Sequence, residues 1–434
     1  IIMNLSQKII DLSEKLRPVL VKILPMNFLR YMKDRVQERS LKKMQNRKRK
    51  PYDPHRYEHG VNLIGCIRAE IGLGQSCRLL ANEIDHTGIP YSIKDFLLDG
   101  ELRAEDHSWD HKIQEELSYG INLLHIEPMD LIMAYLKMDP EVWDYRYNIA
   151  FWLWELEEFP EIWKKSLELV DEIWTPSEFT SACIRKVTDK PVLTIPYCVT
   201  APAEEQYNRE YFNLPEDSFL FLVMYDTNST MARKNPMGAI QAFQRAFSPE
   251  DQRVGLVIKM NNPRQEDLEA LKDSLGAYEN IYYITEIMDK VVVNSLIRSV
   301  DVFVSLHRAE GFGLVMAEAM LNGTPCIATN WSSNTEFMNE DVACMVDYEF
   351  TVLEHTSPPY EKGARWADAN VDTAAGYMRR LLEEPEYYQS LAERGKHYIE
   401  EKLGMEQAVT AIRQRIQEIQ KDFAEDKKLW KIER

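Results

Sequence analysis

The apolar and polar positions between residues 296 and 330 alternate in blocks that predict one complete structural unit. Residues 301–305 form a short apolar, β-branched run, which is the pattern of a strand buried on both faces. Residues 314–321 place apolar side chains at helical spacing, and Gly323 follows as a C-cap. A second buried strand is predicted over residues 325–328. Together these segments form a βαβ unit, which binds ligands at the carboxyl ends of its strands.

Similar blocks run along most of the chain and predict two Rossmann-like α/β units, separated by a linker at about residues 198–212. The other predicted strands cover residues 61–65, 91–96, 121–126, 147–154, 172–175, 191–196, 219–224, 256–259 and 280–285. The other predicted helices cover residues 76–86, 237–247, 369–383, 386–400 and 404–423. Residues 97–120 and 349–367 are polar or rich in charge and proline, and both segments are predicted to be irregular.

The first fifty residues differ from the rest of the chain. Apolar residues recur at helical spacing over 9–24 and again over 28–36, with a kink at Pro18 and a break at Pro25. This segment carries 14 Lys and Arg against 4 Asp and Glu. A basic amphipathic helical extension suits a membrane surface or a membrane-bound partner, and it equally suits packing on the protein itself. Both interpretations stay open, and Pro51 marks the boundary of the segment.

Composition limits the class of protein. A length of 434 residues indicates two domains of ordinary size, and no run approaches 18 apolar residues, so no membrane span is expected. The net charge of −18 includes +10 from the first fifty residues, so the remainder carries −28, which argues against nucleic-acid binding. The six cysteines lack CxxC spacing and are expected to be reduced core residues of a cytosolic protein. Two pairs of histidines have i,i+4 spacing, but their polar, irregular surroundings argue against a helix, and we expect no metal site; the pairs are His55/His59 and His107/His111.

Candidate ligand-binding residues lie where the loop of the βαβ unit at residues 296–330 meets its helix. Gly311, Phe312 and Gly313 open that helix, and its exposed N–H groups and positive dipole end attract phosphate. Glu310 precedes the glycines and Glu318 follows them inside the helix. Because a carboxylate would repel an anion, these two side chains are expected to contact neutral hydroxyl groups. A diphosphate with hydroxyl groups on either side describes a nucleotide-sugar.

Cations and further glycines lie near the ends of other predicted strands. Arg233 and Lys234 precede a helix, where their charge and the helix N–H donors together suit a diphosphate. Lys259 ends the next strand and faces either the same phosphate or solvent. Gly72 and Gly74 lie in a turn between the first predicted strand and its helix, as in the opening of a dinucleotide-binding unit.

Two strand ends in the N-terminal half carry polar side chains. His125 lies at the end of the predicted strand 121–126 and is either an ordinary buried histidine or a cleft residue. Glu155, Glu157 and Glu158 follow another predicted strand. They either bind sugar hydroxyl groups or begin a solvated helix, where acidic residues are favoured in the first turn.

Glu310 and Glu318, with seven residues between them and a Gly-Phe-Gly sequence after the first, resemble the signature of the retaining nucleotide-sugar glycosyltransferases of family 4, also called group 1. The resemblance covers roughly residues 60–420. It implies the GT-B fold, in which two Rossmann-like doubly wound parallel-sheet domains face each other across a cleft. The expected parts are the helical extension 1–50, an acceptor domain 51–200, a donor domain 201–403 and a C-terminal helix 404–434 that crosses back to the first domain.

The resemblance also implies roles for single residues. Catalytic roles fall to Glu310, near the donor sugar, and to His125, which resembles the family's cleft histidine, while Glu318 holds the ribose. Lys234 matches the family's phosphate-binding lysine, but Ser229 stands about where the family commonly has an arginine. The residues expected to bind the donor are Gly72, Gly74, Arg233, Lys234, Lys259, Gly311, Phe312, Gly313, Leu314 and Glu318.

The expected function is therefore a retaining, metal-independent hexosyltransferase. It would move a hexose-type sugar from a UDP- or GDP-sugar, with no other cofactor, to a hydroxyl group of a glycan or glycolipid in surface polysaccharide assembly. The expected partners are this donor, this acceptor and a membrane surface or membrane-bound partner, with no nucleic acid, and the expected location is cytoplasmic, at the inner face of the membrane. Two other functions stay open, a non-catalytic GT-B partner subunit and a nucleotide-sugar epimerase or hydrolase.

Overall fold

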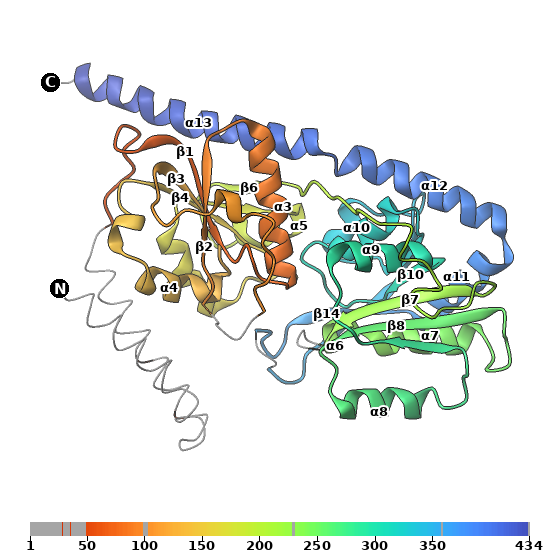
Figure 1. The fold of residues 1–434 in the computed structure, drawn as a ribbon. Coiled ribbons are helices and arrows are strands. Elements are labelled where there is room, and N and C mark those ends of the chain that lie inside the picture. Colours follow the sequence, from red (N-terminus) through yellow and green to blue (C-terminus); the bar gives the residue numbers. More distant parts are fainter. Residues whose placement is uncertain are drawn as a thin grey trace.

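Two parallel β-sheets lie side by side in the structure, and the last two helices of the chain run along them (Figure 1). The structure is a computed structural model that describes residues 49–98, 103–227, 231–356 and 359–432, with side chains to residue 421, together with Phe28 and Arg35. The predicted N-terminal extension otherwise lies outside the described residues. Within the described part of the chain, no helix is long and apolar enough to cross a membrane.

The first sheet has six parallel strands in the order β2-β1-β3-β4-β5-β6. Its elements are β1 (Glu58–Gly65), α3 (Gly72–Thr87), β2 (Tyr91–Asp95), η1 (Asp110–Lys112), β3 (Tyr119–His125), α4 (Pro128–Lys137), η2 (Pro140–Val142), β4 (Tyr147–Phe151), η3 (Glu161–Leu169), β5 (Glu172–Thr175), α5 (Glu178–Arg185) and β6 (Val192–Thr194). The apolar strands are buried on both faces, which is why their sequences are continuous apolar runs rather than alternating ones.

A ladder of buried asparagines crosses the first sheet. Asn62, Asn122 and Asn148 lie opposite one another on β1, β3 and β4. The Asn62 Nδ2 donates to Asn122 Oδ1 at 2.9 Å, and the Asn122 Nδ2 donates to Asn148 Oδ1 at 2.8 Å. Because a shift of one residue would strand these buried amides among apolar side chains, the ladder fixes the register of the three strands.

The second sheet also has six parallel strands, in the order β12-β11-β10-β7-β8-β9. Its elements are β7 (Phe219–Asp226), α6 (Met231–Lys234), α7 (Pro236–Ala246), β8 (Val254–Asn261), α8 (Gln265–Ser274), β9 (Ile281–Ile284), α9 (Lys290–Ser299), β10 (Val302–Ser305), α10 (Leu314–Leu321), β11 (Cys326–Thr329), η4 (Ser333–Glu336) and β12 (Cys344–Val346). The predicted βαβ unit is β10, α10 and β11, and the bounds of its helix agree with the prediction.

The prediction that residues 349–367 are irregular is wrong at both ends of the segment. These ends belong to an antiparallel hairpin of β13 (Tyr348–Val352) and β14 (Arg365–Ala369), whereas the described residues between the two strands form an irregular loop. Tyr360, in the loop of this hairpin, is buried against Trp154 of the first α/β unit, with ring centroids 5.8 Å apart. The charges and prolines of the loop hid the short alternating pattern of the two strands.

Smaller differences concern the ends of elements. Helix α3 begins at Gly72 rather than at residue 76, so both glycines of the predicted turn lie in its first turn. Strand β4 ends at Phe151, and Trp152 to Trp154 continue beyond the sheet. Glu155 therefore lies in a loop and does not begin a helix.

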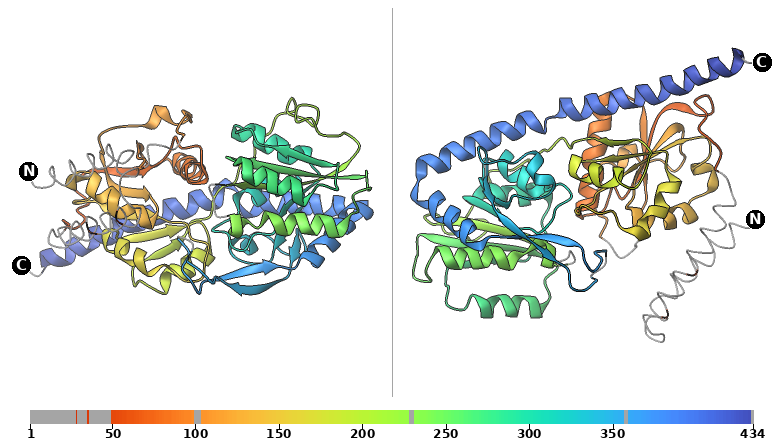
Figure 2. Two further views of the ribbon diagram at one scale, coloured as in Figure 1. Left: turned by 90° about the horizontal axis from the view of Figure 1, so that it is seen from below. Right: turned by 180° about the vertical axis from the view of Figure 1, so that it is seen from behind.

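Three helices complete the chain, and the last returns to the first sheet. They are α11 (Val371–Glu383), α12 (Pro385–Lys402) and α13 (Met405–Ile432). Helix α12 lies beside the second sheet and α13 runs along the first (Figures 1 and 2). Arg415 of α13 holds both oxygens of the fully buried Glu172, through Nε at 3.0 Å and Nη2 at 2.7 Å. This ion pair fixes α13 to the start of β5.

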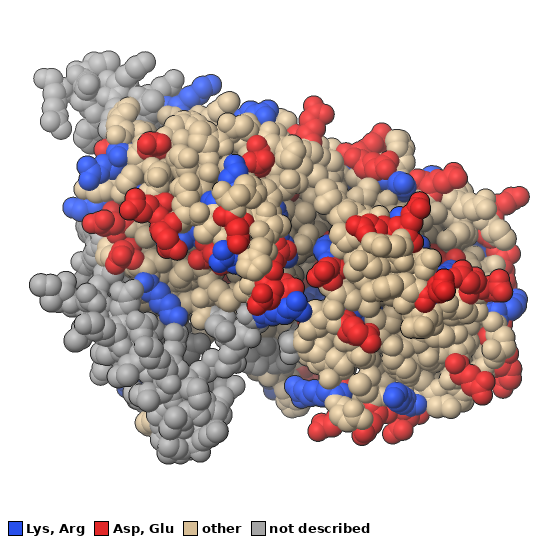
Figure 3. Space-filling model, viewed as in Figure 1, with Lys and Arg blue, Asp and Glu red and all other residues tan. Residues whose placement is uncertain are grey.

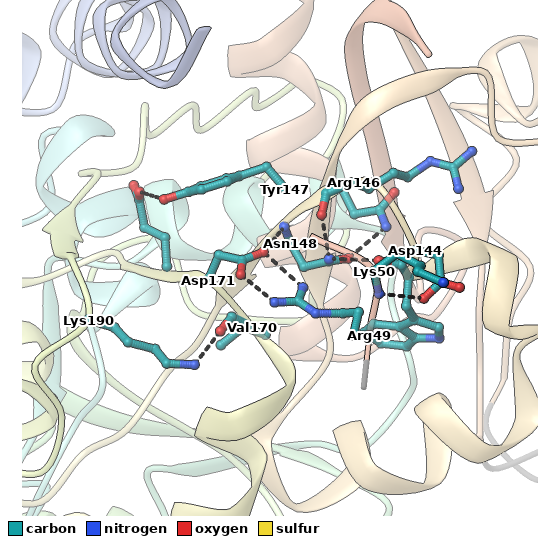
Figure 4. Close-up of polar contacts among 12 residues, drawn as sticks. Arg49, Lys50, Asp144, Arg146, Tyr147, Asn148, Val170, Asp171 and Lys190 are labelled. Atoms are coloured by element: carbon teal, nitrogen blue, oxygen red, sulfur yellow. Dashed lines mark hydrogen bonds and ion pairs between the residues drawn. The ribbon is translucent and has the colours of Figure 1, made fainter. Parts of the chain in front are cut away.

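The continuously described part of the chain begins at Arg49, on the side of the first sheet where its strands have their amino ends. Arg49 Nη1 donates to Asp171 Oδ2 at 2.8 Å, and the same oxygen accepts from the Asn148 N–H at 2.8 Å (Figure 4). The Lys50 N–H donates to Asp144 at 3.1 Å. Asn148 lies near the amino end of β4 and Asp171 precedes β5. The residues before Arg49 therefore join the protein at the amino ends of these strands.

Candidate active site

A cavity of about 430 Å³ lies between the carboxyl ends of the two sheets. Its described lining residues are Gly72, Leu73, Glu127, Met129, Leu153, Trp154, Glu155, Trp163, Val223, Met224, Arg233, Lys234, Asn235, Ala239, Phe303, Val304, Ser305, Leu306, Glu310, Gly311, Phe312, Gly313, Leu314, Val315, Met316 and Pro359. Eight of the predicted site residues are among them, namely Gly72, Arg233, Lys234, Glu310, Gly311, Phe312, Gly313 and Leu314. The position agrees with the rule that open parallel sheets bind ligands at their carboxyl ends.

The start of α10 lines this cavity and has no side-chain cap. Gly313 is the N-cap, in the left-handed region at φ 98°, and it has no side chain to cap the helix. A Cβ there would lie 2.5 Å from the Met316 Cε, so this turn requires glycine. The Phe312 ring packs against Tyr197, with ring centroids 4.9 Å apart. The helix start is therefore held rigidly and left open to an anion.

Two cations share the carboxylate of Glu310. The Lys234 ammonium pairs with Glu310 Oε1, and Arg233 Nη1 lies 3.4 Å from the same oxygen. Burial alone would raise the pKa of Glu310, but Lys234 and Arg233 outweigh it and hold the pKa at about 2. Glu310 is therefore ionised, and Lys234 is held beside the start of α10.

Arg233 connects the two walls of the cavity. Its Nε lies 3.3 Å from Glu155 of the first α/β unit, and its Nη1 donates to the Ala309 carbonyl at 2.8 Å. Burial would lower the pKa of Arg233, but Glu155 and Glu310 raise it above its ordinary value. The guanidinium is thus committed to two carboxylates, whereas Lys234 contacts one of them.

Glu318 lies beside the cavity rather than among its lining residues. Its side chain is 1% exposed, and Oε1 lies 2.6 Å from Lys290 Nζ of α9. Oε2 has no hydrogen-bond partner among the residues that the structure describes. Burial raises the pKa of Glu318, and the charge of Lys290 offsets part of this rise. Lys290 was not predicted, because only the tertiary packing of α9 on α10 brings it to Glu318.

His125 is buried at the end of β3 and does not line the cavity. Its Nε2 lies 2.6 Å from Ser76 Oγ, and its ring stacks on Phe151 with centroids 5.4 Å apart. Burial lowers the pKa of His125 to about 4, so the ring is neutral. Of the two interpretations of this residue, the geometry favours the buried, hydrogen-bonded histidine, and its catalytic role stays a prediction.

Gly74 and Lys259 have other contacts. A Cβ on Gly74 would lie 1.9 Å from the Ala69 carbonyl oxygen, so this glycine lets α3 pack on the preceding loop. The Lys259 ammonium donates to Asn261 Oδ1 at 2.5 Å and to the Glu286 carbonyl at 2.9 Å. Neither residue lines the cavity, and their donor-binding roles stay predictions.

The N-terminal wall of the cavity contains residues that the sequence did not single out. Glu127, Met129 and Trp163 line it. Glu127 lies two residues after the end of β3, so the rule about carboxyl strand ends pointed to this residue. Trp163 had no such signal, because η3 folds back over α4 only in the tertiary structure. No group of three or more His, Cys, Asp or Glu among the described residues is arranged to hold a metal ion.

Direct contacts between the two α/β units close the cavity. Ser177 at the start of α5 donates to the Gly311 carbonyl at 3.2 Å. The Glu336 carboxylate of η4 accepts from the N–H groups of Glu178 and Phe179 at 2.9 and 2.7 Å. The Tyr360 hydroxyl donates to Glu155. The cavity thus depends on both sheets for its shape.

Comparisons with known proteins match part of this chain to a protein family. Residues 208–398, which include the whole second sheet, match the family model of the group 1 glycosyl transferases. This matched part of the chain belongs to that family. A search of the curated proteins finds no match to this glycosyl transferase.

Solved structures resemble this glycosyl transferase over most of its length and share its GT-B fold. Anabaena HepE, in complex with UDP and glucose, is 11% identical, with 83% of this chain and 100% of that chain covered and a TM-score of 0.61. The sucrose-phosphate synthase of Thermosynechococcus elongatus is 15% identical, with 86% and 99% covered and a TM-score of 0.61. A glycosyltransferase from Rickettsia africae is 13% identical, with 84% and 99% covered and a TM-score of 0.59. The predicted fold class is confirmed.

Proposed function

We propose that this glycosyl transferase moves a hexose-type sugar from a nucleoside diphosphate sugar to a hydroxyl group of a glycan or glycolipid, with retention of anomeric configuration. One observation carries the proposal: the open start of α10 and the Lys234 ammonium face one cavity at the carboxyl ends of both sheets. The helix dipole and a cation supply the charge that a departing diphosphate needs, which makes the proposed reaction independent of a metal ion.

In the proposed reaction, the acceptor hydroxyl oxygen forms a bond to the anomeric carbon of the donor while the bond from that carbon to the diphosphate oxygen breaks. The electron pair of the broken bond leaves with the diphosphate, which also takes the hydroxyl proton. Attack and departure occur on the same face of the sugar, so the configuration is retained. Positive charge develops on the sugar ring, and the ionised Glu310 beside it stabilises that charge.

Lys234 is paired with Glu310 in the structure, so donor binding requires Lys234 to change its partner. The diphosphate competes with Glu310 for the Lys234 ammonium, while Arg233 keeps Glu310 neutralised at 3.4 Å. Glu310 is then free to accept hydrogen bonds from sugar hydroxyl groups. This exchange leaves no carboxylate facing the diphosphate without a cation nearby, which limits the electrostatic cost of binding.

The proposed donor is a UDP-sugar. The related HepE structure holds UDP-glucose, which favours uridine over the guanosine alternative. The test is a thermal-shift panel of UDP, GDP, ADP and dTDP with their sugar conjugates. A ligand at about 100 times its dissociation constant stabilises the folded state by about 2.7 kcal/mol. A clear shift with the uridine ligands supports the proposal, whereas a flat panel contradicts it and favours a non-catalytic partner subunit.

We further propose that the enzyme works in surface polysaccharide assembly at the inner face of a membrane, held there through residues 1–50. The supporting observation is the charge of this segment, 14 Lys and Arg against 4 Asp and Glu, in a chain of net charge −18. Acidic side chains are spread over the described surface of both α/β units on the face in Figure 3. A negatively charged membrane would repel that surface and attract the basic segment.

A further inference from the structure

Ser332, in the turn that follows β11, has a backbone conformation that ordinarily requires glycine. Its φ is 72° and its ψ is −155°. A side chain is strained in this region, so residues other than glycine persist there only where the surrounding structure imposes the conformation, often at functional sites. Ser332 is almost fully buried, so the reason for a serine here must lie in what its hydroxyl group contacts.

The hydroxyl group of Ser332 contacts the backbone of Glu310. Its Oγ accepts from the Glu310 N–H at 2.9 Å, in a buried hydrogen bond between residues 22 positions apart. Ser332 is also the N-cap residue of η4, but its side chain caps no N–H group of that helix. Capping is the usual role of a serine at this position. The hydroxyl group is therefore directed away from its own helix and toward the cavity loop.

This hydrogen bond belongs to a set that fixes the backbone of three consecutive residues at the cavity. The Ala309 carbonyl accepts from Arg233 Nη1 at 2.8 Å. The Gly311 carbonyl accepts from Ser177 Oγ at 3.2 Å. The serine of the turn supplies the contact to the residue between them, Glu310. Because a side chain follows the position of its own backbone, this contact affects where the Glu310 carboxylate lies in the cavity.

Other contacts hold the turn in its strained conformation. The Thr335 N–H and hydroxyl groups both donate to the Ser332 carbonyl, at 3.2 and 2.7 Å. The next residue, Ser333, has its Oγ 3.0 Å from Ser177 Oγ of the first α/β unit. The turn is thus held from its own helix and from the opposite unit, which is the condition under which a strained serine persists.

We propose that Ser332 is a positioning residue for the transfer reaction, whose hydroxyl group holds the Glu310 backbone so that the Glu310 carboxylate meets the donor sugar. The inference rests on the proposed transferase function, in which Glu310 accepts hydrogen bonds from sugar hydroxyl groups. Ser332 acts through Glu310 and is not among the described residues that line the cavity. A glycine would fit this backbone without strain but would leave the Glu310 N–H without this acceptor.

The first test separates the hydroxyl group from the strain. Ser332→Ala loses the hydroxyl group and keeps a Cβ, whereas Ser332→Gly loses both. Calorimetric titration gives the dissociation constants of UDP and of the UDP-sugar with the largest thermal shift. We expect the ratio of the UDP-sugar constant to the UDP constant to rise about ten-fold in both variants, because Glu310 contacts only the sugar. In urea unfolding, Ser332→Gly should be more stable than Ser332→Ala, because glycine adopts this backbone without strain.

A serine elsewhere in the second α/β unit provides the matched control. Ser295 of α9 is buried, and its Oγ accepts from the Glu204 N–H at the same distance of 2.9 Å, but it does not line the cavity. Ser295→Ala should therefore lower the stability and leave the ratio of the two dissociation constants unchanged. Ser332 variants that lose stability with an unchanged ratio would show a structural role only and overturn the proposal. A Ser332→Gly protein no more stable than Ser332→Ala would also overturn it, because the serine would then hold no strain.

Glu310→Gln distinguishes a failure of this inference from a failure of the proposed function. It removes the charged acceptor itself, so the ratio of the two dissociation constants should rise at least as much as in the Ser332 variants. If the ratio rises in Glu310→Gln and not in Ser332→Gly, the positioning role is wrong and the proposed function stands. If it stays unchanged in Glu310→Gln, or if the unchanged protein binds neither ligand, the proposed function fails and the positioning role fails with it.

Discussion

At the scale of single residues, the contact between Glu318 and Lys290 leads to a specific prediction about donor affinity. The Glu318 side chain is 1% exposed, and one of its oxygens has no hydrogen-bond partner in the described part of the chain. If the ribose hydroxyl groups bind there, Glu318→Gln weakens donor binding by about 1–3 kcal/mol, since the hydroxyl groups lose a charged acceptor. Calorimetric titration with the nucleotide measures this.

Two variants separate binding from folding in this experiment. Lys290→Met leaves Glu318 buried without a counter-charge and lowers the unfolding midpoint, and combining it with Glu318→Gln recovers most of that loss. Glu393→Gln, at an exposed position of α12, should change neither the donor affinity nor the unfolding midpoint. Donor affinity in Glu318→Gln equal to that of the unchanged protein would remove Glu318 from the site.

At the same scale, the single residue His125 makes the stability of the folded protein depend on pH. Burial lowers the pKa of His125 to about 4, while the unfolded chain keeps the ordinary value of 6.5. Between these values the unfolded state binds a proton that the folded state does not, so stability falls as the pH drops from 6.5 to 4. The loss is on the order of 3 kcal/mol for this one histidine.

Urea unfolding at pH 7.0 and pH 5.0 measures this dependence. His125→Asn removes the titrating ring and keeps a polar group near Ser76, so the difference in stability between the two pH values should shrink. His59→Asn is the matched control, because His59 is exposed and its ring contacts Gln420 of α13. If the stability difference between pH 7.0 and pH 5.0 is the same in His125→Asn and in the unchanged protein, His125 is not the source of the pH dependence.

At the scale of elements, α5 receives part of its N-terminal capping from the other α/β unit, in addition to its own N-cap Ser177. Glu336 of η4 accepts from the first two N–H groups of α5, at 2.9 and 2.7 Å. Glu336→Ala removes this bridge and should cost about 1–2 kcal/mol of unfolding free energy. We also expect a larger radius of gyration in solution scattering, because one contact that holds the two units together is lost.

Glu340→Ala provides the control for this bridge, since Glu340 lies four residues away and is exposed. It should leave both the stability and the scattering curve unchanged. A Glu336→Ala protein as stable and as closed as the Glu340→Ala protein would show that Ser177 and Tyr360 hold the units together without Glu336.

The elements themselves were largely predictable from the sequence. Strands such as Val302–Ser305 are short apolar runs buried on both faces, so their pattern survives without tertiary information. The hairpin formed by Tyr348–Val352 and Arg365–Ala369 was missed, because its strands are mostly exposed and its stability comes from Tyr360 and Trp366 packing on the first unit. Hydrophobic periodicity carries no information about such a contact.

The candidate site was predictable to a similar degree. Glu310 and Gly313 were found because a helix start after a buried strand has a local pattern. The Lys290 and Arg233 ion pairs join residues that are distant in the sequence, so spacing could not reveal them. For the same reason the sequence left two interpretations of His125 open, and only its contact with Ser76 distinguishes them.

At the scale of the whole molecule, α13 ties the end of the chain to the first sheet through one buried ion pair. Arg415 holds both oxygens of Glu172, whose side chain also accepts from Tyr147 at 2.9 Å and Trp174 at 2.6 Å. Arg415→Met should cost about 3–5 kcal/mol in urea unfolding, because it leaves a buried carboxylate without a counter-charge. Arg413→Met, which loses bonds to carbonyl groups only, should cost less. If the two variants lose equal stability, the ion pair does not hold the helix.

The position of Arg49, where the continuously described chain begins, leads to a prediction about the residues before it. Arg49 contacts Asp171 at the amino ends of the strands, while the cavity lies at their carboxyl ends. Deleting residues 1–48 should therefore abolish co-sedimentation with vesicles containing anionic lipid and leave the affinity for the donor nucleotide unchanged. Vesicles of neutral lipid serve as the control and should bind neither form. Equal vesicle binding by both forms would reject the membrane role of the segment, and a loss of donor affinity in the shortened chain would show that the segment supports the cavity from the far edge of the sheet.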